Sequence, residues 1–432
     1  MRRKMLEKLR EWAKRPGRKP LVLQGARQVG KTYTLLEFGQ SDFEGVAYVN
    51  LESDALAREA FAGDLTPREV LARLAPLLSR PVTPQTLLFL DEIQSCKRAL
   101  AALKYFCERM PEQPVAVAGS LLGVAVRGDD VGFPVGKVDF LTMHPMDFEE
   151  FAWACGQGAL TDAVREGFAR DVRVSGVEHE LLVRLYREYL VVGGMPEAVA
   201  CHAATREAAG WEEVRLAQNR LRQSMAADMA RYATPTETRR ILACYESLPR
   251  QLAKPNQKFQ YRVVRMGATA SRYDYALDWL SQAGLVAQCH AVSSVERPLP
   301  TFEDPSAFKA FLMDVGLYGA MAGFRPEEIV AAHPGTAFGG LAETYVAQAL
   351  AANDIKPYYW ASGSGAEVDF VYDGAAAPVA VEVKRGEHVR SRSLAALLAR
   401  APAVRAVRLS EREFGRTDRL LSLPLYAAFL LT

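Results

Sequence analysis

The sequence predicts an α/β protein whose N-terminal part is a parallel β-sheet covered by helices. Three observations in residues 1–145 support this fold class: short apolar runs alternate with amphipathic segments, a glycine-rich turn follows the first run, and a later run ends in two carboxylates. The 432 residues exceed what one hydrophobic core accommodates, so several domains are expected. With 49% hydrophobic and 24% charged residues, the chain has the composition of a folded protein.

The first apolar run, residues 20–24, leads directly into the turn Gly25-Ala-Arg-Gln-Val-Gly30-Lys31-Thr32. This is the pattern of a phosphate-binding loop (P-loop), and a helix-forming segment follows it as the pattern requires. The two glycines let backbone N–H groups converge on phosphate oxygens, Lys31 adds a positive charge at the β- and γ-phosphates, and the Thr32 hydroxyl is a ligand for Mg²⁺. The turn therefore predicts a site for ATP and Mg²⁺.

Two further apolar runs end in polar residues that belong to the same predicted site. The first ends in Asp91 and Glu92, where a parallel strand would leave the sheet and where open α/β sheets bind their ligands. Asp91 is expected to hold the water shell of Mg²⁺, and Glu92 to polarise the attacking water. The second run ends in Ser120, which either contacts the γ-phosphate or the water, or caps the next helix.

Several segments, in this order along the chain, resemble prokaryotic AAA-type ATPases whose C-terminal half is a domain of unknown function. They span nearly the whole sequence: GARQVGKT, LFLDEIQ, the GS after the third strand, FPVGKVDFLTMHPMDFEEF, YLVVGGMPEAV, FKAFLMDVGLYGA, EVDF and VEVKRG. The chain departs from the family at Lys137, where arginine is usual, and in GSLLG, where a more polar run is usual. Lys137 cannot form the planar guanidinium fork of an arginine.

The same resemblance implies one more nucleotide contact. The segment from Gly193 to Pro196 resembles the Gly-x-Pro element by which related ATPases contact the base of the nucleotide, so Pro196 is a candidate residue. An ordinary turn between two helices explains the segment equally well. Arg127 is one candidate for an arginine that acts on the nucleotide of a neighbouring subunit, and oligomerisation stays open.

The middle of the chain is expected to form two helical parts. Residues 146–240 repeat apolar residues at helical spacing, as in a helical lid. Within residues 241–335, the stretch from Arg250 to Arg272 carries six basic residues and no acidic one, and an amphipathic helix ending near Gly284 follows it. The arrangement looks like a winged helix-turn-helix that binds DNA. The alternatives are a protein-packing module and a plain solvated face, so DNA contact is a hypothesis.

Residues 336–432 are expected to form a last α/β domain with a second set of catalytic candidates. Glu343 lies in a helical segment, Asp369 and Glu382 lie at the ends of apolar strands, and Lys384 shares a strand face with Glu382. The pattern resembles the PD-(D/E)XK nuclease-like fold. The resemblance implies that the three carboxylates bind Mg²⁺ or Mn²⁺ and that Lys384 is the catalytic amine. The alternative is a Glu382–Lys384 ion pair in an inactive fold.

The remaining composition excludes some classes of protein. The six cysteines are scattered without metal-site spacing, no apolar run reaches the roughly 20 residues of a membrane span, and no secretory signal opens the chain. The protein is therefore expected to be cytoplasmic, without a membrane partner. A formal net charge of +2 neither predicts nor excludes nucleic acid.

Together, these features predict an ATP-hydrolysing switch of the AAA type. Its nucleotide state is expected to rearrange the lid and the winged helix and so to control the C-terminal domain. Two functions compete for that domain: metal-dependent cleavage of DNA or RNA, or regulation through binding of a protein partner or DNA.

Overall fold

The computed structural model describes residues 1–119, 134–205, 210–254, 256–332, 339–362, 365–384 and 392–432. The chain forms two compact units. The N-terminal unit comprises Arg2–His144 and Gln282–Gly284, and the C-terminal unit comprises Met1, Pro145–Ser281 and Leu285–Thr432. Among the helices of the described residues, none is long and apolar enough to cross a membrane.

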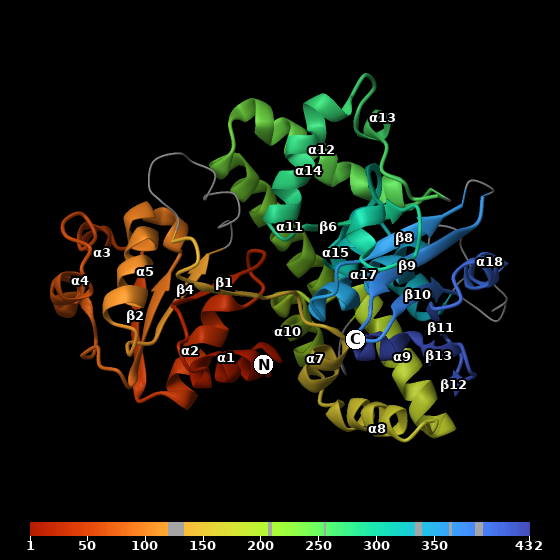
Figure 1. The fold of residues 1–432 in the computed structure, drawn as a ribbon, viewed down its shortest axis with the longest axis horizontal. Helices are drawn as coiled ribbons and strands as arrows, with labels where there is room; N and C mark the ends of the chain where they lie inside the picture. The colour runs from red at the N-terminus through yellow and green to blue at the C-terminus, as the bar shows by residue number, and fades with distance from the viewer. Residues whose placement is uncertain (120–133, 206–209, 255, 333–338, 363–364, 385–391) are drawn as a thin grey trace. The chain divides into compact units, whose positions relative to one another are not determined.

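The N-terminal unit contains a five-stranded sheet in the order β2-β3-β4-β1-β5, and every strand pair in it is parallel (Figure 1). This confirms the predicted parallel α/β fold. The strands are β1 (Leu21–Gln24), β2 (Gly45–Asn50), β3 (Thr86–Asp91), β4 (Val115–Gly119) and β5 (Asp139–Thr142). The helices are α1 (Met5–Lys14), α2 (Lys31–Asp42), α3 (Ala55–Glu59), α4 (Pro67–Leu74) and α5 (Lys97–Arg109).

The two central strands explain why the apolar runs are continuous in the sequence. Every residue of β3 and β4 is buried, as expected for strands of a parallel sheet that is covered on both faces. Leu103 and Phe106 of α5 pack in one core cluster with Leu88 and Leu90 of β3. Asp91, which ends β3, therefore stands on a rigid support.

The C-terminal unit begins with helices. They are α7 (Phe148–Ala154), α8 (Gly158–Ala169), α9 (Gly176–Val192), α10 (Pro196–Thr205), α11 (Glu212–Tyr232), α12 (Pro235–Leu252), α13 (Tyr261–Val264) and α14 (Ala270–Gln282). The starts of α7, α9 and α12 follow from the sequence, since Asp147, Ser175 and Thr234 each form a capping box with a glutamate three residues later. Four further helices lie between or after the strands: α15 (Val315–Ala322), α16 (Pro326–Val330), α17 (Gly339–Ala352) and α18 (Arg392–Arg400).

A second sheet of eight strands has the order β12-β13-β11-β10-β9-β8-β6-β7 (Figure 1). Its strands are β6 (Val286–Val292), β7 (Glu303–Leu312), β8 (Tyr358–Ala361), β9 (Glu367–Asp373), β10 (Pro378–Val383), β11 (Arg405–Ser410), β12 (Gly415–Arg416) and β13 (Leu420–Pro424). From α17 to β11 the order of elements is helix, three strands, helix, strand, with β8, β9 and β10 antiparallel and β10 parallel to β11.

This sheet crosses the boundary at residue 335 that the sequence analysis places between two domains. The predicted winged-helix residues form α12, α13 and α14 followed by the antiparallel hairpin of β6 and β7. Strand β6 also pairs in parallel with β8, in the register His290 to Tyr358. The hairpin and the strands with the second set of catalytic candidates are therefore one continuous sheet.

Candidate functional site

The glycines of the P-loop are required by the shape of the backbone. Gly25 has a φ of 145°, and a Cβ atom there would lie 2.2 Å from the carbonyl oxygen of Met143. Gly30 has a φ of 97° and immediately precedes α2. A side chain at either position would strain the turn, because L residues rarely adopt these angles. The turn thus delivers the chain to the N-terminus of α2 in the geometry of an anion site.

Lys31 is held inside the loop that it follows. Its Nζ donates hydrogen bonds to the carbonyl oxygens of Gly25 and Ala26, both at 2.8 Å, and the residue is 8% exposed. Arg3 of the segment before α1 fixes the loop from outside, since its guanidinium donates to the carbonyl oxygens of Val29 and His144, each at 2.7 Å. The ammonium therefore stands at the loop, where bound phosphate oxygens are expected.

Thr32 and Asp91, the two predicted magnesium ligands, lie within one hydrogen bond of each other. The Thr32 hydroxyl donates to Asp91 Oδ2 at 2.8 Å, and Asp91, 4% exposed, ends β3. Hydroxyl and carboxylate oxygens are hard ligands of the kind Mg²⁺ prefers, and Mg²⁺ at such sites uses one or two of them together with water and substrate phosphates. The two residues fit this ion.

Tyr48 is a member of the site that the sequence analysis missed. Its hydroxyl donates to Asp91 Oδ2 at 3.2 Å and accepts a hydrogen bond from Asn50 Nδ2 at 3.3 Å. Burial and the nearby carboxylates raise the pKa of Tyr48, so the hydroxyl stays protonated. The sequence signal for Tyr48 was the alternation of side chains along a strand. Tyr48 and Asn50 lie on one face of β2, and β2 pairs with β3.

Glu92 directly follows Asp91 and has an unusual backbone for a glutamate, with a φ of 51°. Its N–H donates to Asp91 Oδ1 at 3.0 Å, and Gln94 donates a hydrogen bond to its carboxylate. Burial raises the pKa of Glu92, with a smaller contribution from the charge of Asp91. Such a shift brings a carboxylate closer to the pKa of an effective base at neutral pH.

Three other positions are singled out from the sequence. Ser120 and Arg127 lie outside the described residues, so their roles stay predictions. Lys137, which replaces the usual arginine, forms an ion pair with Glu108, with a distance of 2.9 Å between Nζ and Oε1.

The glycine segment before Pro196 forms the turn between α9 and α10 in the C-terminal unit. Gly193 has a φ of 76°, and a Cβ atom at Gly194 would lie 1.9 Å from the carbonyl oxygen of Met146. The Gly194 N–H donates to Asp314 Oδ2 at 2.6 Å. Close packing against Met146 and Asp314 thus accounts for both glycines. Contact between Pro196 and a nucleotide base stays a prediction.

The second set of candidates lies in the C-terminal unit as a cluster of charged residues, of which Glu382 is buried and the others are partly exposed. Glu343 comes from α17, Asp369 from β9, and Glu382 from β10. Lys384 directly follows β10, and its Nζ lies 2.5 Å from Glu382 Oε1. Asp369 Oδ2 accepts the backbone N–H of Val383 at 2.7 Å. We call these residues, together with Glu367 and Lys309 described next, the carboxylate cluster.

Lys309 of β7 is the member that sequence reasoning missed. It is 2% exposed, and its Nζ lies 2.8 Å from Glu367 Oε1 and 3.5 Å from Glu343 Oε2. Gln257 donates a hydrogen bond of 2.7 Å to the other oxygen of Glu343. The available signal was a single lysine inside the apolar run FKAFL, where a buried charge requires a partner.

Burial raises the pKa values of two carboxylates in the carboxylate cluster. Desolvation raises the pKa of Asp369 well above its usual value, and the charges of Glu343 and Glu382 raise it further. Burial also raises the pKa of Glu343, against the opposing effect of Lys309. Within the residues that the structure describes, no group of three or more His, Cys, Asp or Glu side chains has a geometry that holds a metal ion. The carboxylate cluster as it stands therefore does not fit the predicted metal.

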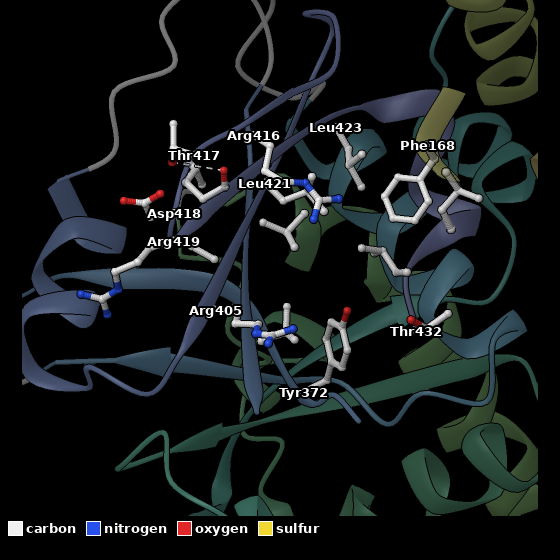
Figure 2. A pocket seen from close by; sticks show the side chains of 16 residues that line it. Phe168, Tyr372, Arg405, Arg416, Thr417, Asp418, Arg419, Leu421, Leu423 and Thr432 are labelled. Carbon is white, nitrogen blue, oxygen red and sulfur yellow. Dashed lines mark hydrogen bonds between the residues drawn. The ribbon is translucent and has the colours of Figure 1, made fainter. Parts of the chain in front are cut away.

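A separate cavity of about 370 Å³ lies in the C-terminal unit, with walls from β11, β12 and β13 (Figure 2). Three arginines line it. They are Arg405, Arg416, which forms an ion pair of 2.9 Å with Asp171, and Arg419, which donates to the backbone carbonyl oxygens of Leu398 and Pro402. None of the candidate site residues that the structure describes lines this cavity.

The parallel sheet, the glycine turn and the carboxylates at the end of β3 define a P-loop nucleotide-binding domain. Residues 17–152 match the family model of an AAA domain. Two more models match further along the chain: a domain of unknown function (DUF8612) over residues 183–328, and a second one (DUF4143) over residues 338–426. Residues 17–152, which make up most of the N-terminal unit, are therefore similar to AAA domains.

Several solved structures are similar to the chain at low sequence identity. No curated protein matches the chain in sequence. The Walker-type ATPase PABY2304 of Pyrococcus abyssi is 15% identical, with a TM-score of 0.43 over 74% of this chain and 95% of that one. The ORC2 protein of Aeropyrum pernix is also 15% identical, with a TM-score of 0.35 over 77% and 94%. DnaA of Aquifex aeolicus is 12% identical, with a TM-score of 0.27 over 64% and 86%. Similarities at this level carry no information about function.

Proposed function

We propose that the chain binds and hydrolyses ATP with Mg²⁺, and that this reaction acts as a switch on the C-terminal unit. The observation that carries the proposal is the 2.8 Å hydrogen bond between Thr32 and Asp91 beside the P-loop. It joins the residue after the phosphate-binding lysine to the carboxylate at the end of the neighbouring strand. That pair is what a phosphate-bound magnesium ion needs from the protein.

Each group at the site has a distinct task in the proposed reaction. The backbone N–H groups between Gly25 and Lys31 bind phosphate oxygens, and the Lys31 ammonium exchanges its contacts with loop carbonyls for contacts with the β- and γ-phosphates. Bound Mg²⁺ neutralises charge on these phosphates. Glu92 orients a water molecule for attack on the γ-phosphate and accepts its proton, which its raised pKa favours.

Variants of Lys31 and Glu92 separate binding from hydrolysis. Lys31→Ala removes a charged hydrogen-bond donor, so ATP affinity should fall about 10- to 100-fold in a titration with a fluorescent ATP analogue. Glu92→Gln keeps the size of the side chain but cannot accept the proton, so kcat should fall about 10²- to 10⁴-fold while ATP still binds. Glu59→Gln, on the exposed side of α3, is the matched control and should leave both quantities unchanged. Full hydrolysis by Glu92→Gln would contradict the assigned role.

The face around α13 supports an action of the switch on nucleic acid. Arg262, Arg265 and Arg272 are exposed there, and Met266 between them is 95% exposed. Clustered exposed arginines beside an exposed apolar side chain suit a polyanion that also offers apolar surface. Duplex DNA affinity should fall in Arg262→Ala/Arg265→Ala, and the dependence of log affinity on log salt should become shallower by about two. Unchanged affinity at low salt would leave a protein partner as the ligand of this face.

For the C-terminal unit, we favour the regulatory alternative over metal-dependent cleavage of nucleic acid. The nuclease hypothesis has support from the order of elements from α17 to β11 and from Glu343, Asp369, Glu382 and Lys384 lying along it. The regulatory alternative has support from the ion pairs that these side chains form. Incubation of labelled DNA or RNA with the protein and Mn²⁺ tests the choice. Cleavage that Asp369→Ala abolishes would restore the nuclease hypothesis.

A further inference from the structure

The carboxylate cluster contains a cation supplied by the protein itself. Lys309 reaches it from β7, which is at the edge of the sheet and belongs to the hairpin before the nuclease-like strands. The register of the hairpin sets Lys309 opposite Cys289 of β6, and β6 in turn pairs with β8. Continuity of the sheet across residue 335 is therefore what brings a lysine from outside the nuclease-like elements to their carboxylates.

The oxygens of the carboxylate cluster are largely occupied by proton donors. Lys309 contacts Glu343 and Glu367, Lys384 contacts Glu382, Gln257 donates to Glu343, and the Val383 N–H donates to Asp369. Within the described part of the chain, Glu382 Oε2 is a buried oxygen of this cluster without a hydrogen-bond partner. A divalent ion at the carboxylate cluster would have to displace these donors to gain several of its oxygen ligands.

We propose that Lys309 serves as a fixed counter-ion in place of a divalent metal, so that the nuclease-like part of the C-terminal unit binds no catalytic metal at this cluster. The ammonium lies between Glu343 and Glu367, where its charge already satisfies the carboxylates and repels a second cation. The carboxylate cluster then joins β7 to α17 and β9 as a structural ion-pair network. This inference does not depend on ATP binding by the other unit.

Titration of the full-length, nucleotide-free protein with Mn²⁺ tests the proposal, with free Mn²⁺ followed by electron paramagnetic resonance. Wild type and Asp369→Asn should take up the same amount of Mn²⁺, because the carboxylate cluster of the wild type binds none. Uptake of one Mn²⁺ by the wild type that Asp369→Asn abolishes would overturn the proposal. This comparison needs no change at Lys309, so it stands even if variants of that residue fail to fold.

Removing the counter-ion gives the complementary result. Lys309→Met should gain one Mn²⁺ per chain and a higher melting temperature in Mn²⁺, and Lys309→Met/Asp369→Asn should lose both gains. Lys258→Met is the matched control, because Lys258 stands near the same Tyr359 ring, at 5.9 Å against 5.3 Å for Lys309. It should behave as the wild type. A folded Lys309→Met protein without the additional Mn²⁺ would overturn the proposal, since Lys309 would then not be what excludes the metal.

Discussion

The P-loop site and the carboxylate cluster both contain carboxylates and lysines, but they differ in which atoms the lysine ammonium groups contact. Lys31 donates to backbone carbonyls, and within the described residues Asp91 accepts hydrogen bonds from the Thr32 and Tyr48 hydroxyls and from the Glu92 N–H. Lys309 and Lys384 instead contact the carboxylates of Glu343, Glu367 and Glu382 directly. A carboxylate bound by neutral donors can exchange them for a metal, whereas one paired with a buried ammonium cannot do so without separating charges. The comparison teaches that the position of the counter-charge, rather than residue composition, separates a ligand site from a structural ion pair.

Removing one partner of the buried network should have the largest effect. Glu343→Ala leaves Lys309 with a single carboxylate partner and Gln257 without its acceptor, so the free energy of unfolding should fall by about 3–5 kcal/mol. Denaturant unfolding of the nucleotide-free protein measures it.

A double-mutant cycle provides the control for this prediction. In Lys309→Met/Glu343→Leu both charges of the pair are replaced by apolar groups, so the loss of stability should be smaller than the sum of the two single effects, although Glu367 also loses its partner Lys309. If the free energy of unfolding of the double variant falls by the sum of the two single effects, charge pairing is not the cause. At the P-loop, Lys31→Ala should change stability far less, because it leaves no buried carboxylate without its partner.

Asp314 extends the comparison to a buried carboxylate that backbone N–H groups bind. Burial raises its pKa from 3.8 to about 6, against the opposing effect of hydrogen bonds from the backbone of Leu317 and Gly194. The folded state therefore binds more protons than the unfolded state between these values. The contribution of Asp314 to stability is fully present below pH 3.8 and is lost as the pH rises through about 6.

The expected loss is about 3 kcal/mol, from the difference between the two pKa values. Unfolding measured at pH 4 and pH 7 in the wild type and in Asp314→Asn isolates it, because the difference between the two proteins cancels the other titrating groups. Asp314→Asn has no such titration, so its stability should depend less steeply on pH. Equal pH dependence of the two proteins would mean that Asp314 is ionised throughout.

The parts of the molecule that could be predicted from the sequence are those whose chemistry is local. Gly25 to Thr32 are contiguous, and Asp91 directly ends an apolar run, so a strand, a turn and a carboxylate sufficed to predict the parallel sheet and the phosphate loop. Caps such as Ser175 with Glu178 are equally local.

The residues missed depend on contacts between distant segments. Lys309 of β7 meets Glu367 of β9 because β6 pairs with both β7 and β8, and β8 pairs with β9. Gly194 meets Asp314 across 120 residues of sequence. No spacing within one segment encodes such a register. For the same reason, the sequence predicts a domain boundary at residue 335, where the structure has a continuous sheet. A pattern of strands does not say which strands pair.

The smallest expected effect concerns Tyr48, whose hydroxyl is a neutral donor to Asp91 at the P-loop. Tyr48→Phe removes one hydrogen bond worth about 1 kcal/mol, so the Mg²⁺ concentration for half-maximal ATP hydrolysis should change about fivefold at saturating ATP. A fall in this concentration means that the hydroxyl competes with the metal for Asp91 Oδ2, and a rise means that it orients the carboxylate for the metal. Because Asp91 Oδ2 also accepts the Thr32 hydroxyl at the shorter distance of 2.8 Å, we expect competition and therefore a fall.

Tyr33→Phe, at an exposed position of α2, is the matched control and should leave the Mg²⁺ dependence unchanged. An unchanged Mg²⁺ dependence in Tyr48→Phe would show that the neutral donors around Asp91 are not displaced by the metal, and it would remove the distinction drawn between the two sites.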